Sequence, residues 1–142
     1  MKKILVITFI TLLSLAKDTK AQTGVPDTLA YLQTIVANKA QYIGQPLSTL
    51  LSDLQIQIKH FSRNTDIVYD ISKETSTSFG WYFPQNADEI YLTYPRLRIS
   101  WQTPLNAYQS GILYTNNNGG WWSTAVYDFY KNGIINDITV DD

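Results

Sequence analysis

The hydrophobic period of this sequence changes near residue 54, and this change predicts the class of fold. Apolar residues over 27–54 recur at steps of three and four, which places them on one face of a helix. Beyond residue 54, apolar and polar residues alternate in several short stretches, as in strands with one buried face. Helices followed by strands predict an α+β fold, in which a helix pair packs on a mainly antiparallel sheet.

The predicted helix pair has recognisable boundaries. Asp27 is a suitable N-cap for the first helix, and Gly44 stands where the left-handed residue after a helix belongs. Pro46 can then be the first residue of a second, shorter helix. The apolar positions of the two helices are Leu29, Leu32, Ile35, Val36, Ala40, Ile43, Leu47, Leu50, Leu51 and Leu54.

About five strands are predicted after the change of period. The candidate stretches are residues 54–58, 67–72, 79–83, 90–94 and 97–101. Pro95 cannot donate to a strand ladder, so the last two stretches are either two strands or one interrupted strand. A C-terminal strand is predicted from the alternation of Ile134, Asn136, Ile138 and Val140.

One or two further short helices are predicted before the C-terminal strand. Thr103 and Pro104 have the residue types of an N-cap and a first helical position, so a helix is expected to begin there. Residues 122–133 fit either a helix or a strand. The helix is favoured because Ser123 can cap it and Gly133 can close it.

The first 21 residues have the layout of a secretory signal peptide. A basic start, Met1-Lys2-Lys3, precedes a mostly apolar run over residues 4–16 and a polar stretch that ends at Ala21. An uncleaved membrane anchor is disfavoured, because the run is short for a hydrocarbon core of about 30 Å and contains three hydroxyl side chains. We expect cleavage after Ala21, export to the periplasm or the medium, and one mature α+β domain over residues 22–142 without further membrane insertion.

The composition of the chain excludes several functions. There is no cysteine among the 142 residues, so disulfides, thiolate metal sites and a lipidated cysteine are excluded. The predicted leader holds four of the eleven basic residues and one of the twelve acidic ones, which leaves a mature net charge of −4. Nucleic-acid binding is not expected, because it depends on clustered Lys and Arg side chains. No motif for a cofactor or a structural zinc ion is present, and none is expected.

One stretch of the chain resembles known sequences. The segment from Tyr42 to Leu54, YIGQPLSTLLSDL, together with the leader ending Thr19-Lys20-Ala21-Gln22, resembles small uncharacterised exported proteins of Bacteroidota-type bacteria. The resemblance implies export. It implies no particular activity, cofactor or binding residue.

Candidate catalytic groups are few. His60 is the only histidine, and it is either a residue at the rim of the core or a general acid–base group that needs a partner in a cleft. Carboxylates occur at Asp66, Asp70, Glu74 and the adjacent pair Asp88-Glu89. Two carboxylates can hydrolyse a glycoside only when about 5–10 Å apart across a cleft. No nucleophile motif is present, so catalytic residues are not assigned and an enzyme is not expected.

Aromatic and arginine side chains suggest a binding surface. Trp81 and Trp101 share strand faces with apolar residues and are predicted in the core, and Trp122 has the spacing of a hydrophobic staple with Tyr127. Neither strand alternation nor staple spacing assigns Trp121 to the core. The predicted binding residues are Trp121, Tyr82, Tyr91, Arg96 and Arg98. The alternative is that these are ordinary exposed aromatics on a charged sheet face.

Three functions are consistent with this sequence. The leading hypothesis is a non-catalytic exported module that binds a protein or an envelope glycan through its aromatic surface. The second is an inhibitor or immunity-type protein of a cell-wall enzyme, which differs from the first only in its partner. The third is an envelope hydrolase that uses His60 or a carboxylate pair, and it requires His60 to meet Asp66 or Asp70 in a cleft.

The leader generates the first testable prediction. Protein recovered from the producing cell should begin at Gln22, because a small residue stands at both the −1 and the −3 position of that cleavage site. N-terminal sequencing and intact mass measure this directly. A retained Met1 would contradict both the cleavage and the export that depends on it.

Overall fold

The computed structural model describes residues 27–67, 69–82 and 94–141. The predicted leader lies outside this part of the chain. Within it, the elements in chain order are α2 (Thr28–Ala37), η1 (Lys39–Gln41), α3 (Leu47–Asp53), β1 (His60–Asn64), β2 (Lys73–Gly80), β3 (Arg96–Asn106), α4 (Ala107–Asn116), α5 (Thr124–Tyr130) and β4 (Ile135–Asp141). No helix of the described residues has the length and apolar character needed to cross a membrane.

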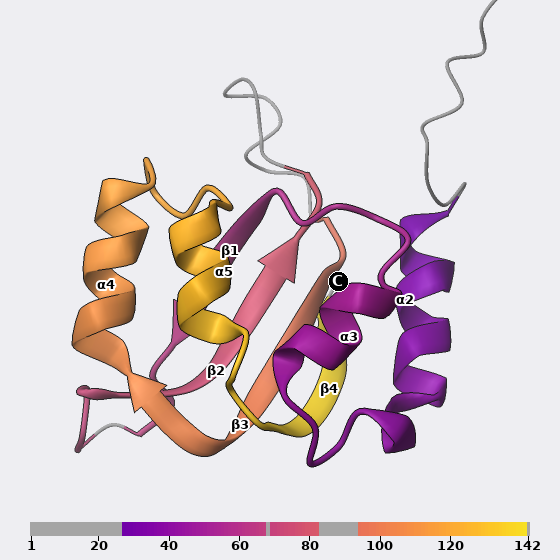
Figure 1. Cartoon of the computed structure of the whole chain (residues 1–142), viewed down its shortest axis with the longest axis horizontal. Helices are drawn as coiled ribbons and strands as arrows, with labels where there is room; N and C mark the ends of the chain where they lie inside the picture. Colours follow the sequence, from indigo (N-terminus) through magenta and orange to yellow (C-terminus); the bar gives the residue numbers. More distant parts are fainter. Residues whose placement is uncertain (1–26, 68, 83–93, 142) are drawn as a thin grey trace, which may run out of the picture.

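The strands form one antiparallel sheet. Their spatial order is β1-β2-β3-β4, so each strand pairs with its neighbour in the chain. Figure 1 shows α5 and α3 in front of the sheet, flanked by α4 and α2. The predicted α+β class and the antiparallel sheet are confirmed, and the sheet has four strands in the described residues rather than about five.

The core lies between the sheet and the helices, with Tyr130 of α5 near its centre. The Tyr130 ring is fully buried and lies 5.5 Å from Phe61, 5.7 Å from Phe79 and 5.9 Å from Trp101, measured between ring centroids. These three rings come from β1, β2 and β3. One helix residue therefore contacts three of the four strands.

Two of the predicted strands are wrong. The predicted strand 54–58 lies in the irregular segment between α3 and β1. Ile58 is buried, so the alternation correctly indicated contact with the core, but the segment does not form a strand. Of the predicted strand 67–72, residue 68 lies outside the described residues, and residues 67 and 69–72 belong to no strand but to the connection between β1 and β2. There the Asp70 carboxylate accepts a hydrogen bond from the Ser72 amide at 3.2 Å, and such local bonds compete with a strand ladder.

The helix predicted to begin at Thr103 begins later. Strand β3 continues to Asn106, whose side chain accepts hydrogen bonds from the amides of Tyr108 and Gln109, both at 3.0 Å. The register between β2 and β3 shifts between Glu74 and Ser76, which leaves Pro104 outside the paired residues of that ladder. A proline is tolerated at such an irregularity because no ladder bond is lost.

Of the remaining predicted elements, one helix is confirmed, parts of two strands are found in β2 and β3, and some residues cannot be compared. The helix reading of residues 122–133 is confirmed by α5, where the Ser123 hydroxyl accepts a hydrogen bond from the Val126 amide at 3.3 Å. Residues 97–101 belong to β3, and β2 ends at Gly80. Residues 83 and 90–93 of two other predicted strands lie outside the described residues.

The C-terminal strand departs from simple alternation. Ile135 and Ile138 are both buried although they stand three positions apart. The ladder explains this, because Ser100 pairs with Asp137 while the next residue, Trp101, pairs with Ile135. The extra residue in β4 is a bulge, which shifts the side-chain parity by one position.

A tight turn after α4 attaches the next segment to the outer edge of β1. Asn118, Gly119 and Gly120 have φ angles of 51°, 79° and 102°, in the left-handed region that suits glycine and asparagine. The Phe61 amide then donates to the Gly120 carbonyl at 2.8 Å, and the Trp122 amide donates to the Lys59 carbonyl at 2.9 Å. The segment that leads from this turn to Trp122 thereby extends the sheet beside β1.

Two glycine substitutions test this attachment. Gly120→Ala should lower the free energy of unfolding by more than about 2 kcal/mol, because the added Cβ would overlap the Phe61 carbonyl oxygen at a left-handed φ. Gly44→Ala is the matched control: its φ is 77°, but no atom lies within 4 Å of the added Cβ. It should cost only about 1 kcal/mol. Urea unfolding measures both, and equal losses would contradict the attachment.

Candidate functional site

The sheet face turned away from the helices is polar. Leu97, Ile99 and Trp101 of β3 are buried in the core, so the alternate residues Arg96, Arg98 and Ser100 point to the opposite side. The neighbouring strands add small or polar residues in register. These are His60, Ser62 and Asn64 of β1, Ser76, Ser78 and Gly80 of β2, and Asp137, Thr139 and Asp141 of β4. We call this side of the sheet the open face.

One row of paired residues crosses the open face. Trp121 forms a β-bridge with His60, His60 pairs with Gly80, Gly80 with Arg96, and Arg96 with Asp141. Residues directly opposite each other in a ladder project their side chains to the same side. The indole of Trp121, 39% exposed, therefore lies in one row with His60 and Arg96.

His60 is packed closely within this row. A Cβ on Gly80 would overlap its imidazole, so the glycine makes room for the ring to lie across β2. The side chain is only 6% exposed. Burial lowers the pKa of His60, the Arg96 charge lowers it further, and a hydrogen bond to the Tyr82 backbone acts in the opposite direction.

Two tyrosines stand beside the ends of the central strands. Tyr82 follows β2 and Tyr94 precedes β3, and their ring centroids lie 4.1 Å apart at an interplanar angle of 31°. Tyr82 is exposed and hydrogen-bonds through its backbone to His60. The tyrosine pair thus adjoins the row of Trp121, His60 and Arg96. Tyr91 lies outside the described residues.

The two predicted arginines differ in their surroundings. The Arg98 Nε donates to the Asp141 carboxylate at 3.0 Å, and the Ser78 hydroxyl donates to the same oxygen at 3.2 Å. Both charged side chains are partly exposed, so this pair contributes less than about 1 kcal/mol. Within the described residues Arg96 takes part in no ion pair. Arg96 is therefore the better candidate for an external carboxylate.

The carboxylates proposed for catalysis do not meet His60. The Asp66 carboxylate accepts hydrogen bonds from the hydroxyls of Thr75 and Ser76, and Ser76 pairs with Asn64 at the far end of β1. Asp70 lies in the turn beyond that end. The arrangement required for an acid–base pair with His60 is therefore not formed by Asp66 or Asp70.

The third carboxylate, Glu74, is buried on the helix side of the sheet. Its Oε1 accepts hydrogen bonds from the Thr77 hydroxyl and, at 2.9 Å, from the Tyr130 hydroxyl. The Trp101 indole N–H donates to the Thr77 hydroxyl at 2.9 Å, which extends the network. Glu74 has no exposed surface, and its Oε2 has no hydrogen-bond partner. This is a sealed polar cluster rather than an accessible catalytic group.

Burial raises the pKa of Glu74. The Ser110, Thr77 and Tyr130 hydroxyls and the Arg63 charge lower it in that order, but they do not offset the loss of hydration. The pKa of Tyr130 is also raised, first by burial and then by the charge of Glu74. Both shifts disfavour ionisation inside the core.

Three of the four tryptophans lie in or against the core, and the fourth is exposed. Trp101 is buried, Trp81 packs against the core with its N–H donating to the Ile56 carbonyl at 3.4 Å, and Trp122 meets Phe79 edge-on at 5.6 Å. Trp122 and Tyr127 line the same pocket, as the staple spacing suggested. Trp121 is the one whose indole is exposed.

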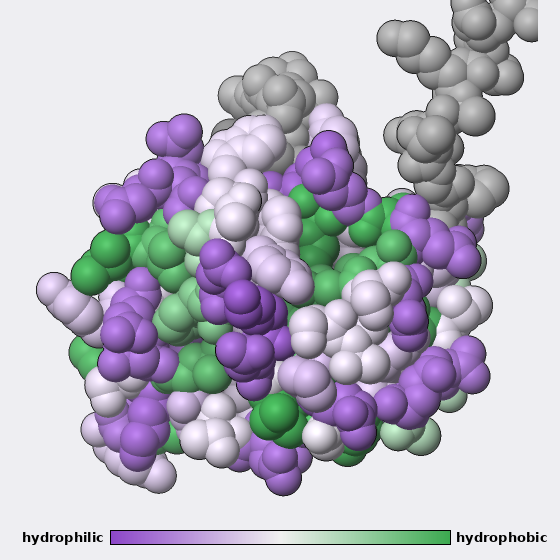
Figure 2. Space-filling view, in the orientation of Figure 1, coloured by the Kyte–Doolittle hydropathy of each residue, from purple (hydrophilic) through white to green (hydrophobic). Residues whose placement is uncertain are grey.

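A concave region on the helix side was not predicted from the sequence. Figure 2 shows hydrophobic residues exposed over the part of the molecule where α4 lies. A pocket there is lined by residues that include Arg63, Ile71, Tyr108 and Ile112. The one available signal was Gly111 in the middle of a helix, because a glycine there costs stability unless close packing requires it.

Neither a metal centre nor a relative identifies the function. Within residues 27–67, 69–82 and 94–141, no three His, Asp or Glu side chains come close enough to hold a metal ion. The sequence matches no protein-family model, no curated protein and no solved structure. What the protein does is therefore inferred from its own residues.

The Glu74 cluster generates a prediction about pH. A carboxyl whose pKa is higher in the folded chain stabilises the fold below its unfolded pKa, and this contribution is lost as the pH rises through the folded pKa. Glu74→Gln mimics the protonated acid. The variant should therefore become progressively more stable relative to the wild type as the pH rises above about 4.5, the ordinary pKa of a glutamate.

Urea unfolding at several pH values measures this difference. Asp128→Asn, which changes an exposed carboxylate paired with Lys131 on α5, is the control for the loss of one carboxylate at the surface. A difference between wild type and Glu74→Gln that is constant with pH would show that Glu74 does not titrate differently in the folded and unfolded chain.

Proposed function

We propose that this protein is a non-catalytic exported binding module, and that its binding surface is one end of the open face. We define this binding surface by Trp121, Tyr82, Tyr94, Arg96 and Arg98. The observation that carries the proposal is the bridge between Trp121 and His60, which aligns the exposed indole with Arg96 across the sheet. The partner is a protein or an envelope glycan.

The chemistry of the surface supports a ligand with both apolar and acidic groups. Indole and phenol rings offer flat apolar faces that pack against aliphatic side chains or the C–H faces of sugar rings, and their polar edges tolerate water. The Arg96 guanidinium can donate two parallel hydrogen bonds to a carboxylate. A carboxylate-bearing glycan or an acidic segment of a protein has the matching groups.

The same geometry makes binding a better proposal than hydrolysis. Glu74 is sealed in the core, and Asp66 and Asp70 lie away from His60. The imidazole is held over Gly80, where bulk water reaches little of it. A general acid–base group has to reach the proton that it transfers.

An inhibitor or immunity-type protein would use the same surface with a different partner. Exposed tryptophan and arginine side chains are common at the centres of protein interfaces, where Trp, Tyr and Arg side chains carry most of the binding energy. The expected export would bring such a protein to a cell-wall enzyme. The two possibilities are separated by the identity of the partner.

Titration with envelope components tests the proposal. Peptidoglycan fragments and soluble glycans should change the tryptophan fluorescence of the wild type in a saturable manner. Trp121→Ala and Arg96→Met should each weaken this binding at least tenfold, because each removes a central contact. Tyr127→Ala removes an exposed aromatic from α5, on the helix side, and should bind as the wild type does.

A pull-down from envelope extracts covers a protein partner. The wild-type chain should retain a saturable partner at micromolar concentration, and Trp121→Ala should lose it while Tyr127→Ala keeps it. A partner retained equally by Trp121→Ala and Arg96→Met, or the absence of any saturable ligand in both experiments, would overturn the proposal.

A further inference from the structure

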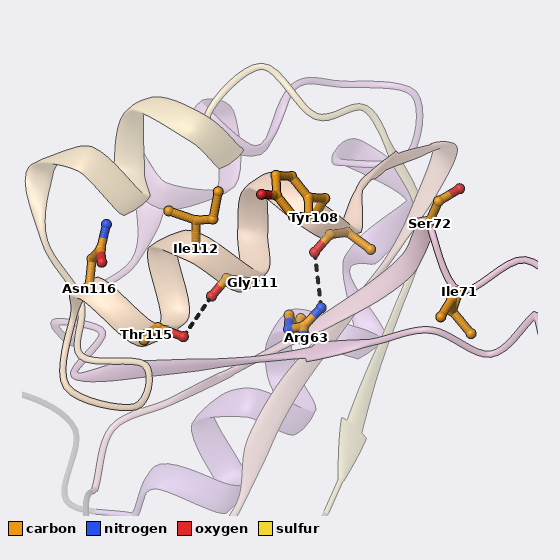
Figure 3. Close-up of a pocket in the computed structure, with 9 residues that line it drawn as sticks. Arg63, Ile71, Ser72, Tyr108, Gly111, Ile112, Thr115 and Asn116 are labelled. Atoms are coloured by element: carbon orange, nitrogen blue, oxygen red, sulfur yellow. Dashed lines mark hydrogen bonds between the residues drawn. The ribbon is translucent and has the colours of Figure 1, made fainter.

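The pocket beside α4 is separate from the open face. Its volume is about 560 Å³, within the range of about 300–1,000 Å³ that is usual for small-molecule sites. Figure 3 shows Arg63 between α4, which carries Tyr108 and Ile112, and the turn that carries Ile71 and Ser72. Arg63 alternates with the open-face residues Ser62 and Asn64 along β1, so its side chain projects to the helix side.

The two walls of the pocket are joined by hydrogen bonds. The Ala107 amide at the start of α4 donates to the Ser72 carbonyl at 2.8 Å. The Ser72 amide in turn donates to the Asp70 carboxylate at 3.2 Å, and Asp70 pairs with Lys73 at 2.8 Å. The turn and the helix therefore hold a defined spacing. The Asp70 charge is also balanced locally by Lys73.

Arg63 is positioned within the pocket by α4. Its Nη1 donates to the Ala107 carbonyl at 2.9 Å. A Cβ on Gly111 would lie 3.2 Å from the Arg63 Cζ, so the glycine lets the guanidinium approach the helix closely. A guanidinium has five N–H donors, and the Ala107 bond uses one of them. Within the described residues, Arg63 forms no ion pair.

The other walls are apolar and exposed. Ile71 is 76% exposed and Tyr108 is 74% exposed, and Ile112 adds a further partly exposed side chain on the next turn of α4. Exposed apolar residues that cluster in this way around a concave site are typical of ligand-binding surfaces. The pocket thus combines a single held cation with an apolar lining.

We infer that this pocket binds a small amphiphilic carboxylate. The carboxylate lies against the free N–H groups of Arg63, and the apolar part of the ligand covers Ile71, Tyr108 and Ile112. A cationic amphiphile is disfavoured, because Arg63 would repel it and the carboxylate of Asp70 is engaged by Lys73 and Ser72. The site does not depend on the binding surface of the open face.

Calorimetric titration of the intact chain with decanoate tests the inference, with decanol and decyltrimethylammonium as ligands of the same chain length and different charge. Decanoate should bind at least tenfold more tightly than either. Arg63→Met should weaken decanoate at least tenfold and remove its advantage over decanol, since the charged donor is lost. Arg98→Met removes an arginine from the open face and should leave decanoate binding unchanged.

A second variant keeps the test independent of the Arg63–Ala107 bond. Ile112→Ser leaves Arg63 in place and changes a partly exposed side chain, so folding should be retained, and decanoate should bind at least threefold more weakly. In ¹H–¹⁵N spectra, decanoate should shift the amides of Gly111 and Ile112. Unchanged decanoate affinity in Arg63→Met, equal binding of the three ligands, or no shift at these amides would each overturn the inference. Loss of decanoate binding in Trp121→Ala would instead assign the ligand to the open face.

Discussion

The burial of Tyr130 against three strands joins helix α5 to the sheet and organises the core. Its ring packs among Phe61, Phe79 and Trp101, and its hydroxyl donates to Glu74. An aromatic side chain of this size buries a large apolar area and requires a partner for its hydroxyl when it is enclosed. Tyr130 thereby meets both requirements and, with the buried Val126, holds helix α5 against the sheet.

The polar cluster around Glu74 lowers the stability of the core but favours one arrangement of the elements that form it. Glu74 sits in the core with one oxygen unpaired, and such groups disfavour burial unless they are neutral or fully bonded. The cluster joins β2, β3 and α5, because the Thr77 and Tyr130 hydroxyls donate to Glu74 and the Trp101 indole N–H donates to the Thr77 hydroxyl. The cluster therefore favours one relative arrangement of these elements over alternatives that would leave more polar groups unpaired.

The two faces of the sheet have different roles. The helix side contains the core and, at its edge, the pocket in which Arg63 lies against α4. The open face carries small and charged residues in register, and the segment after α4 adds Trp121 to its edge. Because adjacent residues in an extended segment point to opposite sides, Trp122 enters the core while Trp121 joins the open face. Of these two consecutive tryptophans, Trp122 therefore packs in the core and Trp121 is exposed on the open face.

Local chemistry made some elements predictable from the sequence. Asp27 and Ser123 cap α2 and α5 as expected, because a cap depends on residues a few positions apart. The core positions of Leu97, Ile99 and Trp101 also followed from their alternation. Other elements depended on partners far along the chain. The alternation over 54–58 indicated which side chains face the core, but it did not show whether the segment pairs with another strand. The continuation of β3 through Pro104 depended on an irregular register with β2.

The α+β class, the caps and the apolar faces could thus be predicted from the sequence, since they arise from neighbouring residues and from burial. Which residues meet across the sheet depends on tertiary contacts. Trp121 comes to His60 and Arg96 through ladder pairing, and Arg63 comes to Gly111 through the packing of β1 against α4. Both surfaces depend on contacts between distant residues, whose partners no local pattern encodes.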